Sequence, residues 1–449
     1  MGKAKRFLIL VLLLSPALSS LGQEKNKTFQ EVDRHSYELY QQGNWKELIR
    51  YCDEALDEGF DYYYLRLRIA TACFETRRYT RAALHFEKAL EFNEGDPVAA
   101  EYLYSCYLEL NRNPEAYRIY EKLPPSSREK LRESLPRLRF VNLEVGMLMS
   151  NEMKKYDTLD LDGEDNIYGE ADIMQEGRYF SGGLSWGFKN GYDVYGSYSL
   201  VTLDKNKMAK IGDTLSVDDL YPLKQHQVYF SGSLPLGKGI TLVPAFNVVL
   251  DRFKTVMPQL NDDSTGYLFP VDEFRVNSYI GCLSVTKDFN IMKVSLFGAV
   301  SNLNEKDQYQ GGFQLVTYPY GNLNLYLLTK LLSHTNDGES HIIFEQMAGF
   351  RLSRNLWGEM SGAFGRMQNY HDKNAFVVYN ITDEIRFKGE ARLIYMIYPH
   401  WMITLEYFYL LREGNYMTYQ AQEGQEIIPV EMKKDFSNNI VLIGLKWKF

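Results

Sequence analysis

The sequence predicts a multidomain α and β protein, with a stack of helix pairs followed by an antiparallel transmembrane β-barrel of about 14 strands. Residues 33–123 repeat with a period near 34. From Arg137 onward, apolar and polar residues alternate in Gly-rich and aromatic segments of about ten to fifteen residues. The chain also ends on such a segment, SNNIVLIGLKWKF. We therefore expect a helical domain over 23–136 and a barrel over 137–449.

The first residues predict export. Lys3, Lys5 and Arg6 precede an apolar run over 7–14, and small residues follow it. This order is typical of a cleavable secretory signal peptide, which we place at residues 1–22. A membrane-spanning helix needs about 20 apolar residues in a row, so the run is too short to be one.

The last strand indicates which membrane the barrel would span. Five apolar side chains alternate along it and fall on one face, and the strand stops on an aromatic residue. This ending resembles the closing strand of bacterial outer-membrane β-barrels, where the terminal aromatic is part of the assembly signal. The resemblance implies the outer membrane of a Gram-negative bacterium, with its lipid and the barrel assembly machinery as partners. The assembly residues would be Val441, Ile443, Leu445, Trp447 and Phe449.

The helical repeat is clearest in two segments. QQGNWKELIRYCDEALDEGFD (41–61) matches ETRRYTRAALHFEKALEFNEGDP (75–97), and ELNRNPEAYRIYEKLP (109–124) is a weaker third copy. The pattern resembles the tetratricopeptide repeat (TPR), which implies paired helices stacked into a solenoid that docks a peptide of a partner protein. We expect a capping helix over 126–135. Because this domain precedes the first strand, we expect it in the periplasm.

Arginines cluster in the second repeat. They have two interpretations: they line the groove and attract an acidic partner, or they form a solvated helical face balanced by Glu75 and Glu87. The residues are Arg66, Arg68, Arg77, Arg78 and Arg81.

The strand pattern predicts an even count, as single-chain bacterial barrels require. Short turns alternate with longer loops around the whole ring, which favours turns on the periplasmic side and loops outside. The longer loops include 151–175, 205–222, 370–383 and 414–436. The expected strands are 138–150, 176–188, 191–204, 223–235, 238–251, 273–287, 289–301, 306–318, 321–334, 340–352, 355–369, 384–397, 400–413 and 437–449.

Alternation also predicts which side chains line the lumen. A charge facing lipid costs about 2–4 kcal/mol at the membrane midplane, so charged residues should face inward. On the twelfth strand, Ile385 and Phe387 would then face lipid. This assignment predicts a mixed lumen wall that leans positive over the last three strands. Two interpretations remain open: a conduit for an anionic solute, or a barrel plugged by salt bridges. The candidate lumen residues are Arg386, Lys388, Glu390, Arg392, Glu406, Arg412 and Lys446.

Other chemistry has little support in the sequence. Seven scattered histidines show no zinc-binding spacing, and there is no phosphate-cradling motif, so we expect no metal, cofactor or enzyme. A Ser–His hydrolase using His226, His334 or His341 and a calcium site at Asp160, Asp162 and Asp165 are the alternatives. The net charge of −8 argues against a nucleic-acid partner. The four cysteines favour buried thiols, with a Cys52–Cys73 disulfide as the alternative; the set is Cys52, Cys73, Cys106 and Cys282.

The order of signal peptide, TPR-like repeats and barrel resembles exopolysaccharide-export porins and the smaller YaiO-type proteins. The resemblance covers architecture and transfers no functional residue. It implies transport or secretion of a polar or anionic substrate such as a polysaccharide, with the repeats docking a periplasmic partner. The alternative is a non-conducting scaffold or assembly factor that recruits periplasmic proteins.

Overall fold

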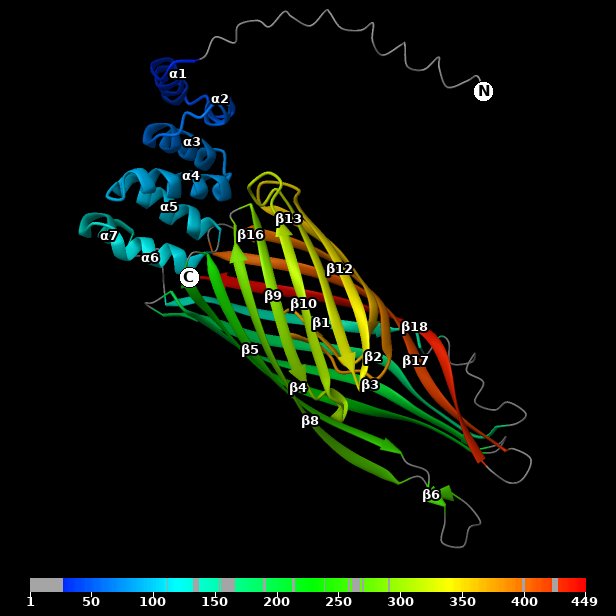
Figure 1. The fold of residues 1–449 in the computed structure, drawn as a ribbon. Helices are drawn as coiled ribbons and strands as arrows, with labels where there is room; N and C mark the ends of the chain where they lie inside the picture. Colours follow the sequence, from blue (N-terminus) through cyan, green and yellow to red (C-terminus); the bar gives the residue numbers. More distant parts are fainter. Residues whose placement is uncertain are drawn as a thin grey trace, which may run out of the picture.

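The computed structural model describes residues 27–449 except 111, 132–136, 153, 155–165, 189–190, 212–214, 238, 257–258, 261–266, 269, 290, 398–399 and 422–426. Within this part, seven helices precede one closed antiparallel barrel (Figure 1). The expected signal peptide and the calcium candidates Asp160, Asp162 and Asp165 lie outside the described residues. The expected boundary at 136–137 falls at the edge of such a gap.

The helices form the expected solenoid of three antiparallel pairs and one further helix. Their bounds are α1 Phe29–Gln41, α2 Trp45–Asp57, α3 Tyr63–Glu75, α4 Tyr79–Phe92, α5 Pro97–Glu109, α6 Asn113–Lys122 and α7 Pro125–Leu131. Both members of each pair recur at intervals of 34 residues, so the predicted period is confirmed. None of the described helices is long and apolar enough to cross a membrane.

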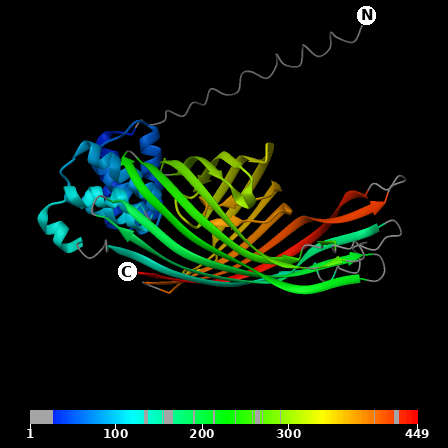
Figure 2. The same ribbon diagram turned by 90° about the horizontal axis from the view of Figure 1, so that it is seen from below.

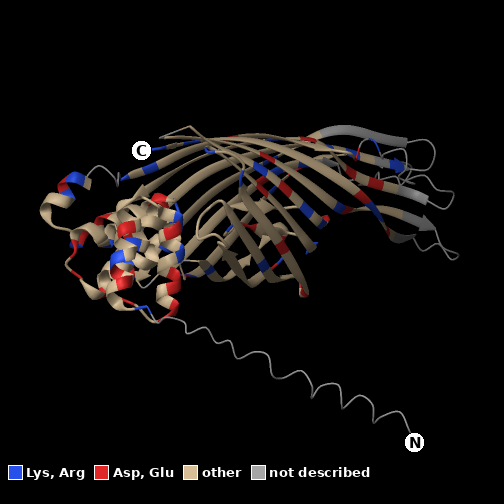
Figure 3. Cartoon of the chain, turned by 90° about the horizontal axis from the view of Figure 1, so that it is seen from above, with Lys and Arg blue, Asp and Glu red and all other residues tan. Residues whose placement is uncertain are grey.

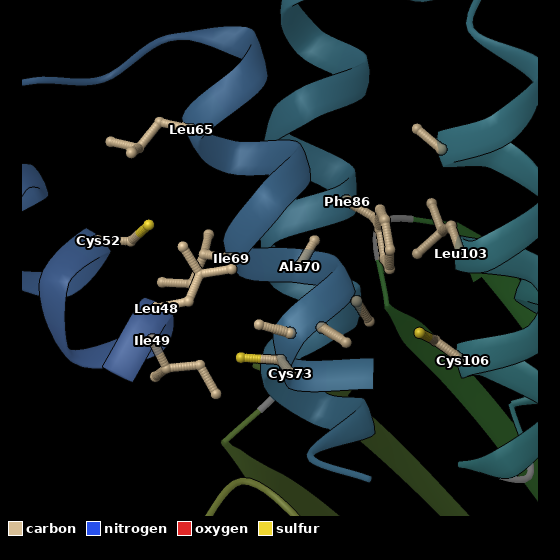
Figure 4. Packing of buried hydrophobic residues seen from close by; sticks show 14 of the residues in the cluster. Leu48, Ile49, Cys52, Leu65, Ile69, Ala70, Cys73, Phe86, Leu103 and Cys106 are labelled. Atoms are coloured by element: carbon tan, nitrogen blue, oxygen red, sulfur yellow. The ribbon is translucent and has the colours of Figure 1, made fainter. Parts of the chain in front are cut away.

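Local sequence explains where these helices begin. Thr28 and Glu31 form a capping box at the start of α1, and Asp96 accepts the first amides of α5 immediately before Pro97. Inside the solenoid, small and apolar side chains from successive helices pack together, among them Leu48, Ile69 and Phe86 (Figure 4). Cys52, Cys73 and Cys106 belong to this core as free thiols, so the disulfide alternative is wrong.

The barrel has 14 strands, which confirms the predicted count. Each strand pairs with its neighbours along the chain, and the first pairs with the last to close the ring. The strands are β1 Leu138–Ser150, β2 Asn166–Gly187, β3 Asp193–Ile211, β4 Leu215–Gly237, β5 Ile240–Val256, β8 Val271–Asp288, β9 Met292–Ser301, β10 Gln308–Thr317, β11 Leu325–Asn336, β12 Glu339–Arg351, β13 Leu356–Met367, β16 Glu384–Ile397, β17 Trp401–Ala421 and β18 Ile427–Lys448. Two small hairpins complete the fold, β6 Gln259–Leu260 with β7 Tyr267–Leu268, and β14 Tyr370–Asp372 with β15 Val377–Tyr379.

The barrel wall is uneven in height. β2 to β5, β17 and β18 extend far beyond β9 to β13 at one end (Figure 2). The predicted loops 205–222 and 414–436 are therefore largely strand. Beyond the membrane a strand has no lipid face, and its pairing can continue there without an apolar outer face. We call this the loop end, and the opposite end, with turns such as 318–324, the turn end.

Apolar side chains cover the outside of the barrel. On β1, Leu143, Val145 and Met147 are exposed, while Asn142 on the other face is buried. A stacked aromatic pair, Trp401 and Trp447, marks the turn end with ring centroids 5.2 Å apart. An apolar band bounded by aromatics is the outer surface of an outer-membrane-type barrel.

The solenoid sits at the turn end (Figure 1). The amide of Thr80 at the start of α4 donates to the carbonyl of Gly321 over 3.3 Å. Arg112, immediately before α6, lies 3.6 Å from the carboxylate of Asp288 at the end of β8. The α3–α4 and α5–α6 turns therefore face the barrel.

Candidate functional site

The lumen contains a hairpin from the barrel's own chain. Residues 368–383 connect β13 to β16 at the loop end, and β14 and β15 pair within this segment. Sequence alternation had marked 370–383 as an ordinary outer loop. Instead, the structure folds it inward, so that Tyr370, His371 and Asp372 are all buried. We call residues 368–383 the lumen hairpin.

One carboxylate fixes the first arm of the lumen hairpin to the wall. Asp372 Oδ1 accepts from Lys330 Nζ of β11 over 2.6 Å, and its Oδ2 accepts from Lys388 Nζ of β16 over 2.5 Å. The exposed fractions are 4% for Asp372, 9% for Lys330 and 1% for Lys388. A buried ion cluster of this kind depends on every partner, because losing one leaves an uncompensated charge in a poorly solvated site.

The tip of the lumen hairpin reaches the opposite wall. Asn247 of β5 donates through Nδ2 to the carbonyl of Ala375 over 2.7 Å. On the returning arm, Asn380 donates to the Asp251 carboxylate of the same strand. Since β5 is the seventh strand from β16 in either direction around the ring of 14, the hairpin spans the full width of the lumen.

Apolar contacts hold both ends of the lumen hairpin. Tyr370 packs into a cluster that includes Leu332, Ile343 and Ile385 on the near wall. Phe376 packs against Tyr229 of β4, with ring centroids 5.2 Å apart, and has Tyr195 of β3 at 6.1 Å. The hairpin is therefore packed in place by side chains from both sides of the barrel.

The lumen hairpin divides the interior into two chambers. The inner chamber, toward the turn end, has a volume of about 370 Å³ and is lined by residues such as Thr286, Gln314 and Arg392. The outer chamber, toward the loop end, measures about 310 Å³ and is lined by Lys207, Asp251 and other polar groups. Hairpin residues line both chambers, so this one segment separates them.

The lumen residues predicted from the sequence lie at several heights along the barrel axis. Arg392 forms a cluster with Glu390 at 3.1 Å, Glu406 at 2.8 Å and Glu359 at 3.1 Å in the turn-end half. Arg412 is buried nearer the loop end, where it pairs with Asp383 and Glu152. The Lys446 ammonium lies 3.4 Å from the ring centroid of Phe140. Together with Lys388, these side chains line the interior without forming a single site.

The prediction for Arg386 is wrong. Strand β16 has an irregular register between Ile385 and Phe387, so Ile385 is buried in the lumen and Arg386 is displaced from it. The Arg386 side chain is 46% exposed and pairs with Glu413 and with Asp435. A bulge adds one residue to the strand and reverses the alternation beyond it, which a strictly alternating pattern cannot foresee.

Most of the cations that suggested a positive wall have carboxylates beside them. Lys330, Lys388, Arg392 and Arg412 all have carboxylate partners. Lys373 of the lumen hairpin likewise lies 3.3 Å from Glu390. The sequence showed the cations, but the hairpin and neighbouring strands provide the compensating acids.

The arginines expected in the solenoid groove are mostly engaged within the solenoid. Arg66 pairs with Asp61 at 2.6 Å, Arg68 with Asp33 at 2.7 Å and Arg81 with Asp53 at 2.8 Å. Arg77 and Arg78 lie in the turn before α4, next to the barrel contact at Thr80. Acidic and basic residues are interspersed over the helices (Figure 3), which fits the alternative of a balanced face.

The rim histidines considered for hydrolysis have other partners. His226 Nδ1 lies 2.7 Å from the Tyr198 hydroxyl, and His334 Nε2 lies 2.7 Å from the Gln368 carbonyl oxygen. His341 lies 3.6 Å from the carboxylate of Glu339.

The amino-acid composition of the lumen hairpin is a signal from which its inward fold could have been predicted. Residues 375–381 read AFVVYNI, which is unusually apolar for a loop at the outer face of a barrel. Buried cations opposite this loop, Lys330 and Lys388, were the second sign. An inward-facing lysine needs a counter-charge, and no strand residue directly opposite supplies one for Lys388, which pairs in register with Ala363 and Leu410.

Known proteins share little sequence with this chain. No protein-family model matches the chain, and no curated protein matches it either. A solved FadL homologue from Pseudomonas aeruginosa is 10% identical with a TM-score of 0.45, covering 79% of this chain and 94% of its own. The toluene transporter TodX of P. putida is 8% identical with a TM-score of 0.44, covering 70% and 91%.

The helical region has its own structural likeness. The second TPR domain of human RPAP3, solved with an HSP70 peptide, is 13% identical with a TM-score of 0.21, covering 23% of this chain and 90% of that domain. Likenesses at this level do not bear on substrate or partner. The fold itself defines the class: an outer-membrane-type β-barrel of 14 strands carrying a TPR-like solenoid.

Proposed function

We propose that the protein is an outer-membrane conduit for a polar solute, closed in this conformation by its own lumen hairpin. The observation that carries the proposal is the pair of chambers, both with charged and polar residues in their walls, that one segment separates. A barrel that served only as an anchor would need no such chambers on both sides of the hairpin. Passage then requires only that the hairpin leave the lumen.

The lining favours polar solutes over apolar ones. Buried Ser181, Asn247 and Ser278 face the interior together with the charged pairs. Because those charges are compensated, we no longer expect a strong preference for anions. A polysaccharide falls within the polar class, although no residue singles it out.

The solenoid would lie in the periplasm. Barrels of this type place short turns on the periplasmic side, and the solenoid contacts the turn end. Its free surface would dock a periplasmic protein that delivers or receives the solute. The internal pairing of Arg66, Arg68 and Arg81 removes the main argument that this partner is acidic.

A non-conducting scaffold is the second candidate, and the filled lumen favours it. Liposome swelling separates the two. Residues 370–379 are replaced by a short glycine–serine linker, and both proteins are reconstituted and exposed to a small neutral sugar. The conduit predicts slow swelling with the native protein and rapid swelling with the shortened one. An impermeable shortened barrel that is folded, as judged by heat-modifiable migration, would favour the scaffold.

A further inference from the structure

We propose that the lumen hairpin is a movable gate and that Asp372 is the latch that keeps it closed. This inference rests on the proposed conduit and adds its regulation. Three independent features support it: the arrangement of the buried charges, the backbone of the hairpin tip, and the space on the outer side.

The charges are divided between the hairpin and the wall. Lys330 and Lys388 belong to strands β11 and β16 of the rigid wall, while Asp372 belongs to the segment that would move. In the closed state the carboxylate compensates both ammonium groups. In the open state the two chambers would merge and water would solvate all three. Neither state then contains an uncompensated charge in a site without water. A segment that alternates between two conformations needs this in both of them.

The hairpin tip is held in a strained conformation. Lys373, Asn374 and Ala375 have φ values of 50°, 56° and 67°, in the left-handed region that residues other than glycine rarely adopt. Three such residues in a row persist only where surrounding contacts impose them. Here the contacts are the bond from Asn247 to the Ala375 carbonyl and the Asp372 cluster. Release of those contacts would relax the tip.

The outer side leaves room for movement. The returning arm, including Asn380 and Asp383, forms part of the wall of the outer chamber. Both ends of the hairpin join the barrel at the loop end, and the long strands β2 to β5 extend beyond that level (Figure 2). Withdrawal toward the loop end therefore needs no change in the pairing of the barrel strands.

The first test removes the latch charge in the full-length protein. Asp372→Asn leaves two buried cations without their shared carboxylate, so we expect the time-averaged current in a planar bilayer to rise about tenfold or more. Glu345 lies 3.9 Å from Lys330 and belongs to the same cluster, so the matched control adds Lys330→Met, Lys388→Met and Glu345→Gln to Asp372→Asn. All four charges of the cluster are then removed together, so the current should return to within about twofold of the native level. If the substitutions merely loosened the barrel, the control with more substitutions would instead carry the larger current.

The second test locks the gate. Cys282 Sγ of β8 lies 4.0 Å from Asn374 Oδ1 at the hairpin tip. Asn374→Cys therefore places a second thiol next to a native one, while the solenoid cysteines are buried in their own core. In the Asp372→Asn background, oxidation should suppress the current about tenfold, and reduction should restore it. Asn374→Ser, which cannot form the disulfide, is the control.

The outcomes separate the latch from the conduit. A current that rises with Asp372→Asn and falls when the disulfide forms supports the gate. If the shortened hairpin conducts but Asp372→Asn does not, the latch is wrong and the conduit stands. If thiol titration shows the disulfide and the current persists, the gate is wrong. If even the shortened hairpin is silent, the conduit itself fails.

Discussion

Many charged side chains in this molecule form ion pairs that join separate elements of the fold. Asp372 bridges two lysines in the lumen, and Arg68 bridges two helices of the solenoid through Asp33. A fully buried pair such as that of Asp372 adds little stability compared with apolar packing, but breaking one costs about 3–5 kcal/mol. They are therefore better suited to specifying a conformation than to strengthening it.

His85 in the solenoid gives a pH-dependent prediction. Burial lowers its pKa from 6.5 to about 3, and the neighbouring Arg66 guanidinium, 3.0 Å from Nδ1, acts in the same direction. Below pH 6.5 the His85 imidazole binds a proton in the unfolded chain but stays neutral in the folded solenoid. The free energy of unfolding is therefore highest above pH 6.5 and falls as the pH drops toward 3. The loss is about 1.4 kcal/mol per pH unit, or about 2 kcal/mol at pH 5.

The measurement is the melting of the helical circular dichroism signal of the full-length protein at pH 7 and pH 5. His85→Gln, which cannot titrate, should melt at a more similar temperature at the two pH values. An equal pH dependence in both proteins would show that His85 is not the responsible group.

Residue-level sequence reasoning rested on regular alternation along each strand. Lys388, Arg392 and Glu406 are inward in the structure, at the positions that alternation gives them. It failed at Arg386, because one bulge moves a side chain to the other face without leaving a trace in composition. Pairing partners were out of reach for a different reason: Asp372 lies far from Lys330 along the chain, and only the fold brings them together.

At the scale of elements, the sequence predicted the helix pairs and all the barrel strands but not their full lengths. The 34-residue period and the apolar faces are local signals, and both were readable. The outer parts of β3, β4, β17 and β18 fall within the predicted loops 205–222 and 414–436. The lumen hairpin was missed because a loop that folds inward is distinguished only by its apolar composition.

The closing strand β18 carries the element-scale prediction. Ile443, Leu445, Trp447 and Phe449 are all exposed on the lipid face, and Phe449 packs on Trp447 with centroids 4.4 Å apart. If this ending is the assembly signal, Phe449→Ser should lower the yield of assembled barrel severalfold, measured as the heat-modifiable fraction in outer membranes. Lys448→Ser, one residue away on the other face, is the control. Equal yields would remove the aromatic terminus from the assembly signal.

At the scale of the whole molecule, closure comes from within the barrel. The solenoid touches the turn end through Thr80 and Arg112, whereas the lumen is filled by a segment that enters from the loop end. The solenoid and the lumen hairpin are thus separate parts of one chain. A partner bound to the solenoid has no direct contact with the hairpin and would act on the solute rather than on the latch.

The most direct test of this account is the single-channel conductance of the native protein and of the variant with residues 370–379 replaced by a short linker, compared in the same bilayer. We expect the native protein to be closed for most of the record and the shortened variant to show a steady conductance step. A native protein that conducts continuously, with the same step as the shortened variant, would contradict closure by the lumen hairpin.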